Sequence, residues 1–156
     1  LLADIIIDTK IRDITPADIP SVVEMITALR AFHNARAAVT PDTLARYTDP
    51  TAPWMYNTVA EREAQLVGYM VLLPLAKIAD GLRGIDINHM YVAPDHRGTG
   101  IGRRLIDAAK AKATALSCSY MFISTAHENT AAQNAYLACG FDAHPDAGGP
   151  RFRMQI

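Results

Sequence analysis

The spacing of apolar and polar residues predicts one strand and two helices in the first third of the chain. Ile11 to Ile14 is read as a short strand. Positions 15–18 read Thr-Pro-Ala-Asp, which fits a capping box with proline in the first turn and predicts a helix. The apolar residues of that helix form one stripe: Ile19, Val22, Val23, Ile26 and Leu29. Thr40-Pro41 has the features of a second helix start.

Three strands and a long helix are predicted in the middle of the chain. Tyr56 to Glu61 and Gln65 to Leu75 are two apolar runs that predict an antiparallel pair turning at residues 62–64. Ile85 to Val92 is a further strand. Gly100 to Leu116 has helical periodicity. Its inward-facing residues are expected to be Ile101, Leu105, Ala108, Ala109 and Leu116.

The last third predicts another helix between strands. Tyr120 to Ser124 is rich in aromatic and β-branched residues, as strands are. Asn129 suits the N-cap of a helix that ends at Cys139, with Gly140 just past its end. A strand is expected from Phe141, and another over Arg151 to Gln155, joined by a loop at 142–150. The fold class is therefore α/β, a single mixed central sheet flanked by helices, in one domain over residues 1–156.

Composition restricts the function classes that fit. The 156 residues are 50% hydrophobic and 20% charged, as in an ordinary globular domain. The net charge of −1 argues against general nucleic-acid binding, and no apolar stretch reaches the length of a membrane span. Two cysteines, Cys118 and Cys139, are too few for a disulfide framework. We therefore expect a cytoplasmic protein that binds neither nucleic acid nor membrane.

The segment 97–102 reads Arg-Gly-Thr-Gly-Ile-Gly and lies between a predicted strand and a predicted helix. Free backbone N–H groups and the helix dipole favour an anion at such a place, which indicates a phosphate-bearing cofactor. A dinucleotide site needs G-x-G-x-x-G with an acidic residue about 20 positions on, and residues 117–123 contain no acid. A P-loop needs a lysine after its glycines, and none follows here.

Two motifs carry a resemblance to a known family. Arg97, Gly100 and Gly102 satisfy the pattern R-x-x-G-x-G, and residues 90–102 look like one strand–loop–helix unit. Residues 129–141 read N-T-A-A-Q-N-A-Y-L-A-C-G-F, with an asparagine before the helix, a tyrosine near its end and Gly-Phe after it. Both motifs resemble signatures of the GNAT superfamily of N-acetyltransferases. The order of the predicted elements is also that family's order.

The resemblance implies that acetyl-CoA is the co-substrate. Glycines let the backbone approach its pyrophosphate, and the family's strand before the loop pairs with the pantetheine arm. That strand carries a bulge in the family, which implies a cleft between residues 90–92 and 120–124. The implied cofactor-binding residues are Met90, Tyr91, Val92, Arg97, Gly98, Thr99, Gly100, Ile101, Gly102, Arg103, Asn129 and Tyr136.

The resemblance also implies direct acetyl transfer. In the family, the residue matching Tyr136 protonates the leaving thiolate, and a backbone N–H at Met90 or Tyr91 would stabilise the oxyanion. A primary amine must lose a proton before it attacks. The candidates for this step on the strand before the loop are Asp86, Asn88 and His89, and we name His89 as catalytic because its pKa range suits a base. Histidine and cysteine spacings indicate no metal site.

The acceptor is expected to be a small-molecule amine. The layout is similar to the diamine acetyltransferase-like branch, but that branch has adjacent acidic residues where this chain has Asn88 and His89, so polyamine specificity is not expected. Phe32, Trp54 and Tyr56 either wall an acceptor pocket or pack in the core. The alternatives are a protein or peptide acceptor, and a non-catalytic acyl-CoA sensor. A homodimer is common in the family, and the sequence locates no interface.

Overall fold

The computed structural model describes residues 8–144 and 152–155. The chain divides into two compact units, Leu1–Ser124 and Thr125–Ile156, which are treated one at a time. The first unit carries the sheet and three helices, and the second carries one helix.

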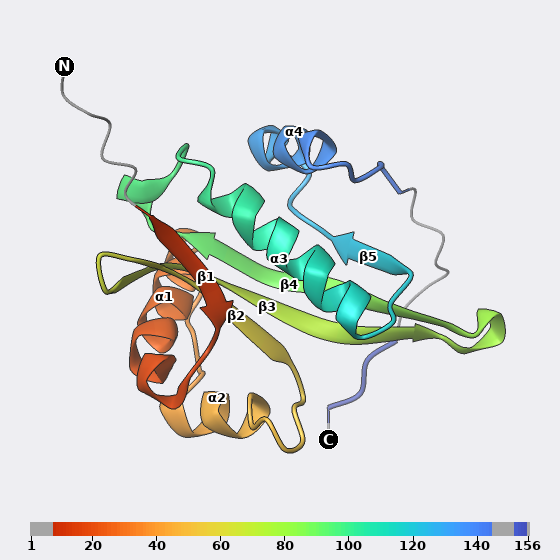
Figure 1. The fold of residues 1–156 in the computed structure, drawn as a ribbon, viewed down its shortest axis with the longest axis horizontal. Coiled ribbons are helices and arrows are strands. Elements are labelled where there is room, and N and C mark those ends of the chain that lie inside the picture. Colours follow the sequence, from red (N-terminus) through yellow and green to blue (C-terminus); the bar gives the residue numbers. More distant parts are fainter. Residues whose placement is uncertain (1–7, 145–151, 156) are drawn as a thin grey trace. The chain divides into compact units, whose positions relative to one another are not determined.

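The first unit is built on a five-stranded sheet with the order β1-β2-β3-β4-β5 (Figure 1). The strands are β1 (Thr9–Asp13), β2 (Tyr56–Arg62), β3 (Gln65–Lys77), β4 (Leu82–Val92) and β5 (Tyr120–Ile123). The first four strands pair antiparallel, and β5 runs parallel to β4. This mixed sheet confirms the fold class predicted from the sequence.

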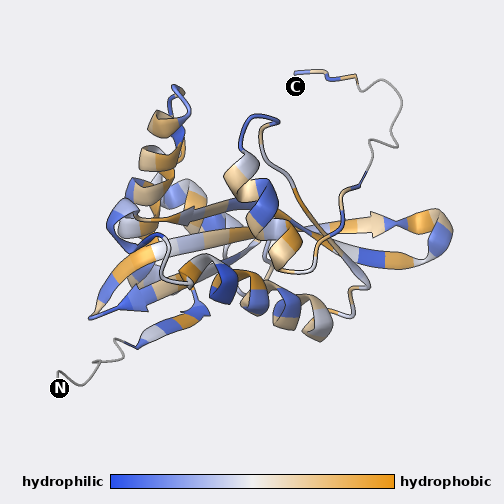
Figure 2. Ribbon diagram, turned by 90° about the horizontal axis from the view of Figure 1, so that it is seen from above, coloured by the Kyte–Doolittle hydropathy of each residue, from blue (hydrophilic) through white to orange (hydrophobic). Residues whose placement is uncertain are grey.

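Helices cover both faces of this sheet (Figure 2). On one face, α1 (Ile19–Phe32) and α2 (Pro41–Tyr47) pack on β2, β3 and β4. The core residues there are Ile19, Val22, Ile26, Leu44, Val59, Tyr69, Val71 and Tyr91. Side chains alternate along a strand, so Met70 and Leu72 point to the opposite face, which α3 (Ile101–Ala115) covers. Alternate side chains of β3 therefore pack against α1 and α2 on one face and against α3 on the other.

A partly buried ion pair fixes the chain just before α1. The Arg12 guanidinium donates to both carboxylate oxygens of Asp18, at 2.7 and 3.0 Å, and its Nε donates to Glu61 at 2.7 Å. The Asp18 carboxylate also accepts from the Thr15 amide and hydroxyl, each at 2.7 Å. These donors, Arg12 first, hold the pKa of Asp18 well below its usual range. The capping box predicted at Thr15 is confirmed.

The second unit shows where the strand predictions were wrong. Its helix α4 (Thr130–Ala138) is capped by Asn129, as predicted. Phe141 does not begin a strand, because its amide donates to the Tyr136 carbonyl at 3.1 Å while the Gly140 amide donates to Leu137 at 3.0 Å. This pair of bonds is a Schellman motif, and Gly140 supplies its left-handed residue with φ +90°.

The predicted C-terminal strand is also wrong where it can be assessed. Residues 152–155 have no strand structure, whereas Arg151 and most of the predicted loop 142–150 lie outside the described residues. Within the described part of the chain, β5 has no neighbour beyond β4, so the sheet ends there. A segment with strand-like composition extends a sheet only where an edge strand pairs with it.

Candidate active site

The glycine segment forms the turn between β4 and α3. A short 3₁₀ helix, Pro94–His96, follows the strand, and α3 begins at Ile101. Gly98 and Gly100 have φ values of +71° and +84°, in the left-handed region that other residues avoid. Gly100 is the N-cap of α3, so the turn needs glycine at the point where the helix starts.

The turn presents a row of unbonded amides. In the described structure, the N–H groups of residues 98–103 have no hydrogen-bond acceptor, and the Arg104 amide makes the first bond of the helix, to Gly100 at 3.1 Å. A Cβ placed on Gly98, Gly100 or Gly102 would meet no atom within 4 Å. Open space above unpaired N–H groups at a helix N-terminus is the geometry of a phosphate site.

The side chains of the loop divide into two groups. Arg97 turns back toward the strand, where its Nε donates to the Val92 carbonyl at 2.9 Å and its guanidinium lies 5.9 Å from the Phe32 ring and 5.8 Å from the Tyr91 ring. Thr99 Oγ1 donates to the His96 carbonyl at 2.6 Å. These two residues brace the turn. Arg103 and Arg104 are exposed in the first turn of α3, and no carboxylate of the described residues pairs with either.

Strand β4 carries a bulge at Asn88. Val71 of β3 faces His89, and the next residue of β3, Leu72, faces Ile87, so Asn88 is the extra residue. The pairing of β4 with β5 ends at Ile87, opposite Ile123. In the described part of the sheet, residues 88–92 therefore have a strand partner on the β3 side alone. The bulge that the resemblance implied is confirmed.

The bulge decides where His89 points. Asp86 faces Leu73 and His89 faces Val71, and these two residues of β3 are two positions apart, so Asp86 and His89 share one face. A regular strand would have put them on opposite faces. The same face carries Tyr69, whose hydroxyl lies 3.2 Å from His89 Nδ1.

The surroundings of His89 disfavour its charged form. Burial, and then the positive charges of Arg30 and His33 near the end of α1, lower the pKa of His89. Tyr69 itself is fully buried, and burial raises its pKa. These surroundings favour the neutral imidazole of His89.

The second unit holds the remaining predicted residues. Asn129 Oδ1 accepts from the Ala132 amide at 3.2 Å, so part of its side chain is used in capping α4. Tyr136 is half-buried, and its ring lies 6.3 Å from that of Phe141 in an edge arrangement. Burial raises the pKa of Tyr136, which keeps its phenol protonated. A protonated phenol is the form that a general acid requires.

Three features were not predicted correctly from the sequence. Tyr69 was not singled out, although a tyrosine in the middle of an apolar run signals a buried hydroxyl that needs a partner. Asn57 is buried, and neither its Oδ1 nor its Nδ2 has a partner among the described residues. Phe32 and Trp54 are 69% and 73% exposed, so core packing, one of the two alternatives for these residues, is wrong for both.

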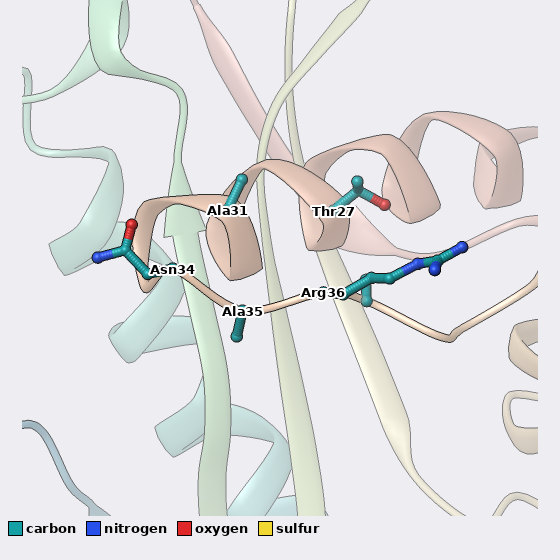
Figure 3. A pocket seen from close by; sticks show the side chains of 6 residues that line it. Thr27, Ala31, Asn34, Ala35 and Arg36 are labelled. Atoms are coloured by element: carbon teal, nitrogen blue, oxygen red, sulfur yellow. The ribbon is translucent and has the colours of Figure 1, made fainter.

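An open pocket lies against the last turns of α1. Its volume is about 470 Å³. Its lining residues are Thr27, Ala31, Asn34, Ala35, Arg36 and Ala37. Figure 3 shows the helix above and the segment with Ala35 and Arg36 passing below it. The lining of this pocket includes none of the predicted site residues.

Two searches of the described structure bear on other kinds of site. Residues 8–144 and 152–155 contain no group of three or more His, Cys, Asp or Glu side chains arranged to hold a metal ion. Over the same residues, every helix is too short or too polar to cross a bilayer.

Comparison with known proteins assigns the chain. A model described as the acetyltransferase (GNAT) family matches residues 23–141, which include the glycine turn and α4. The chain belongs to the GNAT acetyltransferase family. Both motifs that carried the resemblance in the sequence lie inside the matched segment.

One relative is similar to the chain over part of its own length. The mycothiol acetyltransferase of Cellulomonas flavigena is 30% identical over 117 residues, which cover 71% of this chain and 34% of that protein. The chain thus spans about a third of this relative's length.

Two solved structures share the fold. The ribosomal-protein-alanine N-acetyltransferase of Brucella melitensis biovar Abortus has a TM-score of 0.74 at 24% identity, covering 93% of this chain and all of that one. AAC(6')-Iy, solved with the bisubstrate analogue CoA-S-monomethyl-acetylneamine, has a TM-score of 0.77 at 19% identity, covering 94% and 99%. At these identities the similarity establishes the GNAT fold alone.

Proposed function

We propose that this protein is an acetyl-CoA-dependent N-acetyltransferase of the cytoplasm that transfers the acetyl group directly to a primary amine of a small molecule. The observation that carries the proposal is the row of unbonded amides at residues 98–103, at the N-terminus of α3 in a GNAT family member. Backbone donors and a helix dipole together stabilise a pyrophosphate without any fixed cation.

The cofactor-binding residues divide the ligand between them. Residues 98–102 donate their amides to the pyrophosphate, and Arg103 adds a charge to it. Met90 and Val92 turn their backbone groups to the open edge of β4, where the amides of the pantetheine arm bind, and Tyr91 lies between them. Arg97 acts by holding the Val92 carbonyl and the turn. Asn129 contacts the pantetheine arm, and Tyr136 reaches the sulfur.

The reaction is one displacement at the thioester carbonyl. The amine nitrogen forms a bond to that carbon, the Met90 amide, which faces the open edge of β4, donates to the developing oxyanion, and the carbon–sulfur bond breaks. Tyr136 gives its phenolic proton to the departing thiolate. The amine proton passes to a group on β4, where Asp86 and His89 share a face.

Binding and turnover are tested separately. Calorimetry with CoA should give 1:1 binding, and a thiol-release assay with acetyl-CoA should respond to at least one member of an amine panel. The panel includes amino sugars, amino acids, a diamine and a peptide with a free N-terminus. Absence of CoA binding would overturn the proposal at its base.

The panel also separates the alternatives. Turnover with the peptide alone would assign a protein or peptide acceptor, as in the ribosomal-protein acetyltransferase that shares the fold. Tight CoA binding without turnover on any amine would assign an acyl-CoA sensor.

A further inference from the structure

The hydroxyl of Tyr69 lies in the core with one partner. Tyr69 is fully buried, and in the described structure its oxygen bonds to His89 Nδ1 alone, at 3.2 Å. The Tyr69 ring also contacts the Tyr91 ring, with centroids 6.0 Å apart. A buried hydroxyl without an acceptor for its proton is unfavourable. The Tyr69 hydroxyl therefore donates its hydrogen bond to His89 Nδ1, its one partner among the described residues.

We infer that Tyr69 is a positioning residue that holds His89 as the neutral tautomer with its proton on Nε2. A neutral imidazole has one N–H donor and one bare nitrogen. If Nδ1 carried the proton, it would donate to the Tyr69 oxygen, and the buried Tyr69 proton would lose its acceptor. If Nδ1 is bare, it accepts from Tyr69, and both groups are satisfied. The tautomer follows from which group is buried more deeply.

The cations around His89 disfavour its charged form. The groups that face it are Arg30 on α1, His33 just past the end of α1, Tyr69 on β3, Asp86 on its own face of β4, and Arg97 beyond Tyr91. The cations Arg30 and His33 oppose a charged imidazole, and burial opposes it further. Asp86 is held by Asn88, whose Nδ2 donates to it at 3.3 Å. Burial raises the pKa of Tyr69, so its hydroxyl remains a donor at every pH of interest.

The tautomer determines whether His89 acts as a hydrogen-bond donor or as a base in the reaction. This step rests on the acetyltransferase function proposed above. With the proton on Nε2, His89 donates a hydrogen bond to an oxygen of the acceptor or of the thioester. It does not take the amine proton, because its bare nitrogen is engaged by Tyr69. Asp86 is then the residue of this strand that is left to act as the base.

The tautomer is measured without any ligand. Two-bond ¹H–¹⁵N spectra of the free protein report which ring nitrogen is protonated, and His89→Gln identifies the His89 signals. We expect the Nε2–H form in the wild type at about tenfold excess or more. Tyr69→Phe keeps the ring and removes the hydroxyl, and it should bring up the Nδ1–H form. Tyr91→Phe is the control, since Tyr91 packs on the same ring but makes no bond to His89, and it should leave the tautomer unchanged.

Activity gives an independent measurement. The glutamine amide can donate where Nε2–H does but cannot act as a base, so His89→Gln should keep at least tenfold more kcat than His89→Ala. Equal losses in the two variants, or an Nδ1–H signal in the wild type, would overturn the inference. A protein that shows the Nε2–H form but transfers no acetyl group would instead refute the proposed function and leave the role of Tyr69 established.

Discussion

The Arg104 amide donates to the Gly100 carbonyl at 3.1 Å, and this bond is the first of α3. Every amide between Gly98 and Arg103 is consequently left for a ligand in the described structure. The two residues thus mark the boundary between the part of the helix that stabilises the fold and the part that is open to an anion.

Gly102→Ala should stabilise the free protein and weaken its binding of CoA. Alanine is better than glycine inside a helix by about 1 kcal/mol, and its methyl group meets no protein atom within 4 Å. The same methyl group occupies space that the pyrophosphate needs, so Kd for CoA should rise about tenfold or more. Thermal unfolding without ligand and calorimetry with CoA measure the two effects.

Thr114→Ala is the matched control for this variant. Thr114 is exposed near the other end of α3, so the substitution also raises helix propensity. It should raise Tm and leave Kd for CoA unchanged.

Gly100→Ala should lower the free energy of unfolding by about 1–2 kcal/mol, unlike Gly102→Ala, because its φ of +84° strains any residue that has a Cβ. If Gly102→Ala binds CoA as tightly as the wild type does, the turn is not part of the CoA-binding site.

Arg103→Ala should weaken CoA binding about tenfold, whereas Arg104→Ala should have little effect. Both guanidiniums are exposed in the first turn of α3 without a carboxylate partner in the described residues, so neither substitution breaks an ion pair. A cation there is unfavourable to the helix dipole unless an anion is bound. Calorimetry at low and high salt tests the pair, and the Arg103 effect should shrink with salt. Equal effects of the two variants would assign Arg103 no special contact.

The strands and helices that the sequence predicts well are those with a long periodic pattern. The apolar stripe of α1 was predicted correctly because burial on one face imposes a helical period, and the antiparallel pairing of β2 with β3 was predicted correctly because a short polar turn separates two apolar runs. Phe141 was misread because strand-like composition competes with a helix-ending signal at the same place. Gly140 in the left-handed region directs the Phe141 amide back to the Tyr136 carbonyl, and that local bond decides the outcome.

The site divides in the same way. The turn at Gly98 and Gly100 could be predicted from the sequence because glycine is the residue that favours the left-handed φ values found there. The pairing of Tyr69 with His89 was out of reach, because it depends on strand register and on one bulged residue. Asn88 carries no signal that distinguishes a bulge from a regular strand position, and a strand without the bulge would put Asp86 and His89 on opposite faces.

Asp18→Asn should destabilise the protein by about 1–3 kcal/mol at pH 7, and the difference from the wild type should fade in acid. Arg12 and Thr15 hold the pKa of Asp18 below its unfolded value. A depressed pKa contributes stability that is fully present above the unfolded pKa, near 4, and that is lost as the pH falls toward the folded pKa. Urea unfolding at pH 7 and at pH 3 measures the difference in free energy of unfolding between the wild type and Asp18→Asn.

Asp107→Asn serves as the control for Asp18. Its carboxylate is 56% exposed and lies 3.9 Å from Lys110, so the pair is screened by water. Its loss should change stability by less than about 0.5 kcal/mol at either pH. A gap for Asp18→Asn that stays constant between pH 7 and pH 3 would show that the carboxylate charge does not stabilise the start of α1.

Tyr136→Phe should lower kcat about 100-fold and leave the affinity for acetyl-CoA nearly unchanged. The phenol is the proton donor to the thiolate in the proposed reaction, and burial raises its pKa so that it stays protonated through neutral pH. Phenylalanine keeps the ring that lies against Phe141, so α4 and its Schellman end should remain intact. Stopped-flow thiol release gives kcat, and calorimetry gives Kd. Phe141→Leu, which perturbs the same contact and leaves the hydroxyl in place, should keep most of the turnover. If both variants lose activity equally, the ring contact and not the proton of Tyr136 is what the reaction requires.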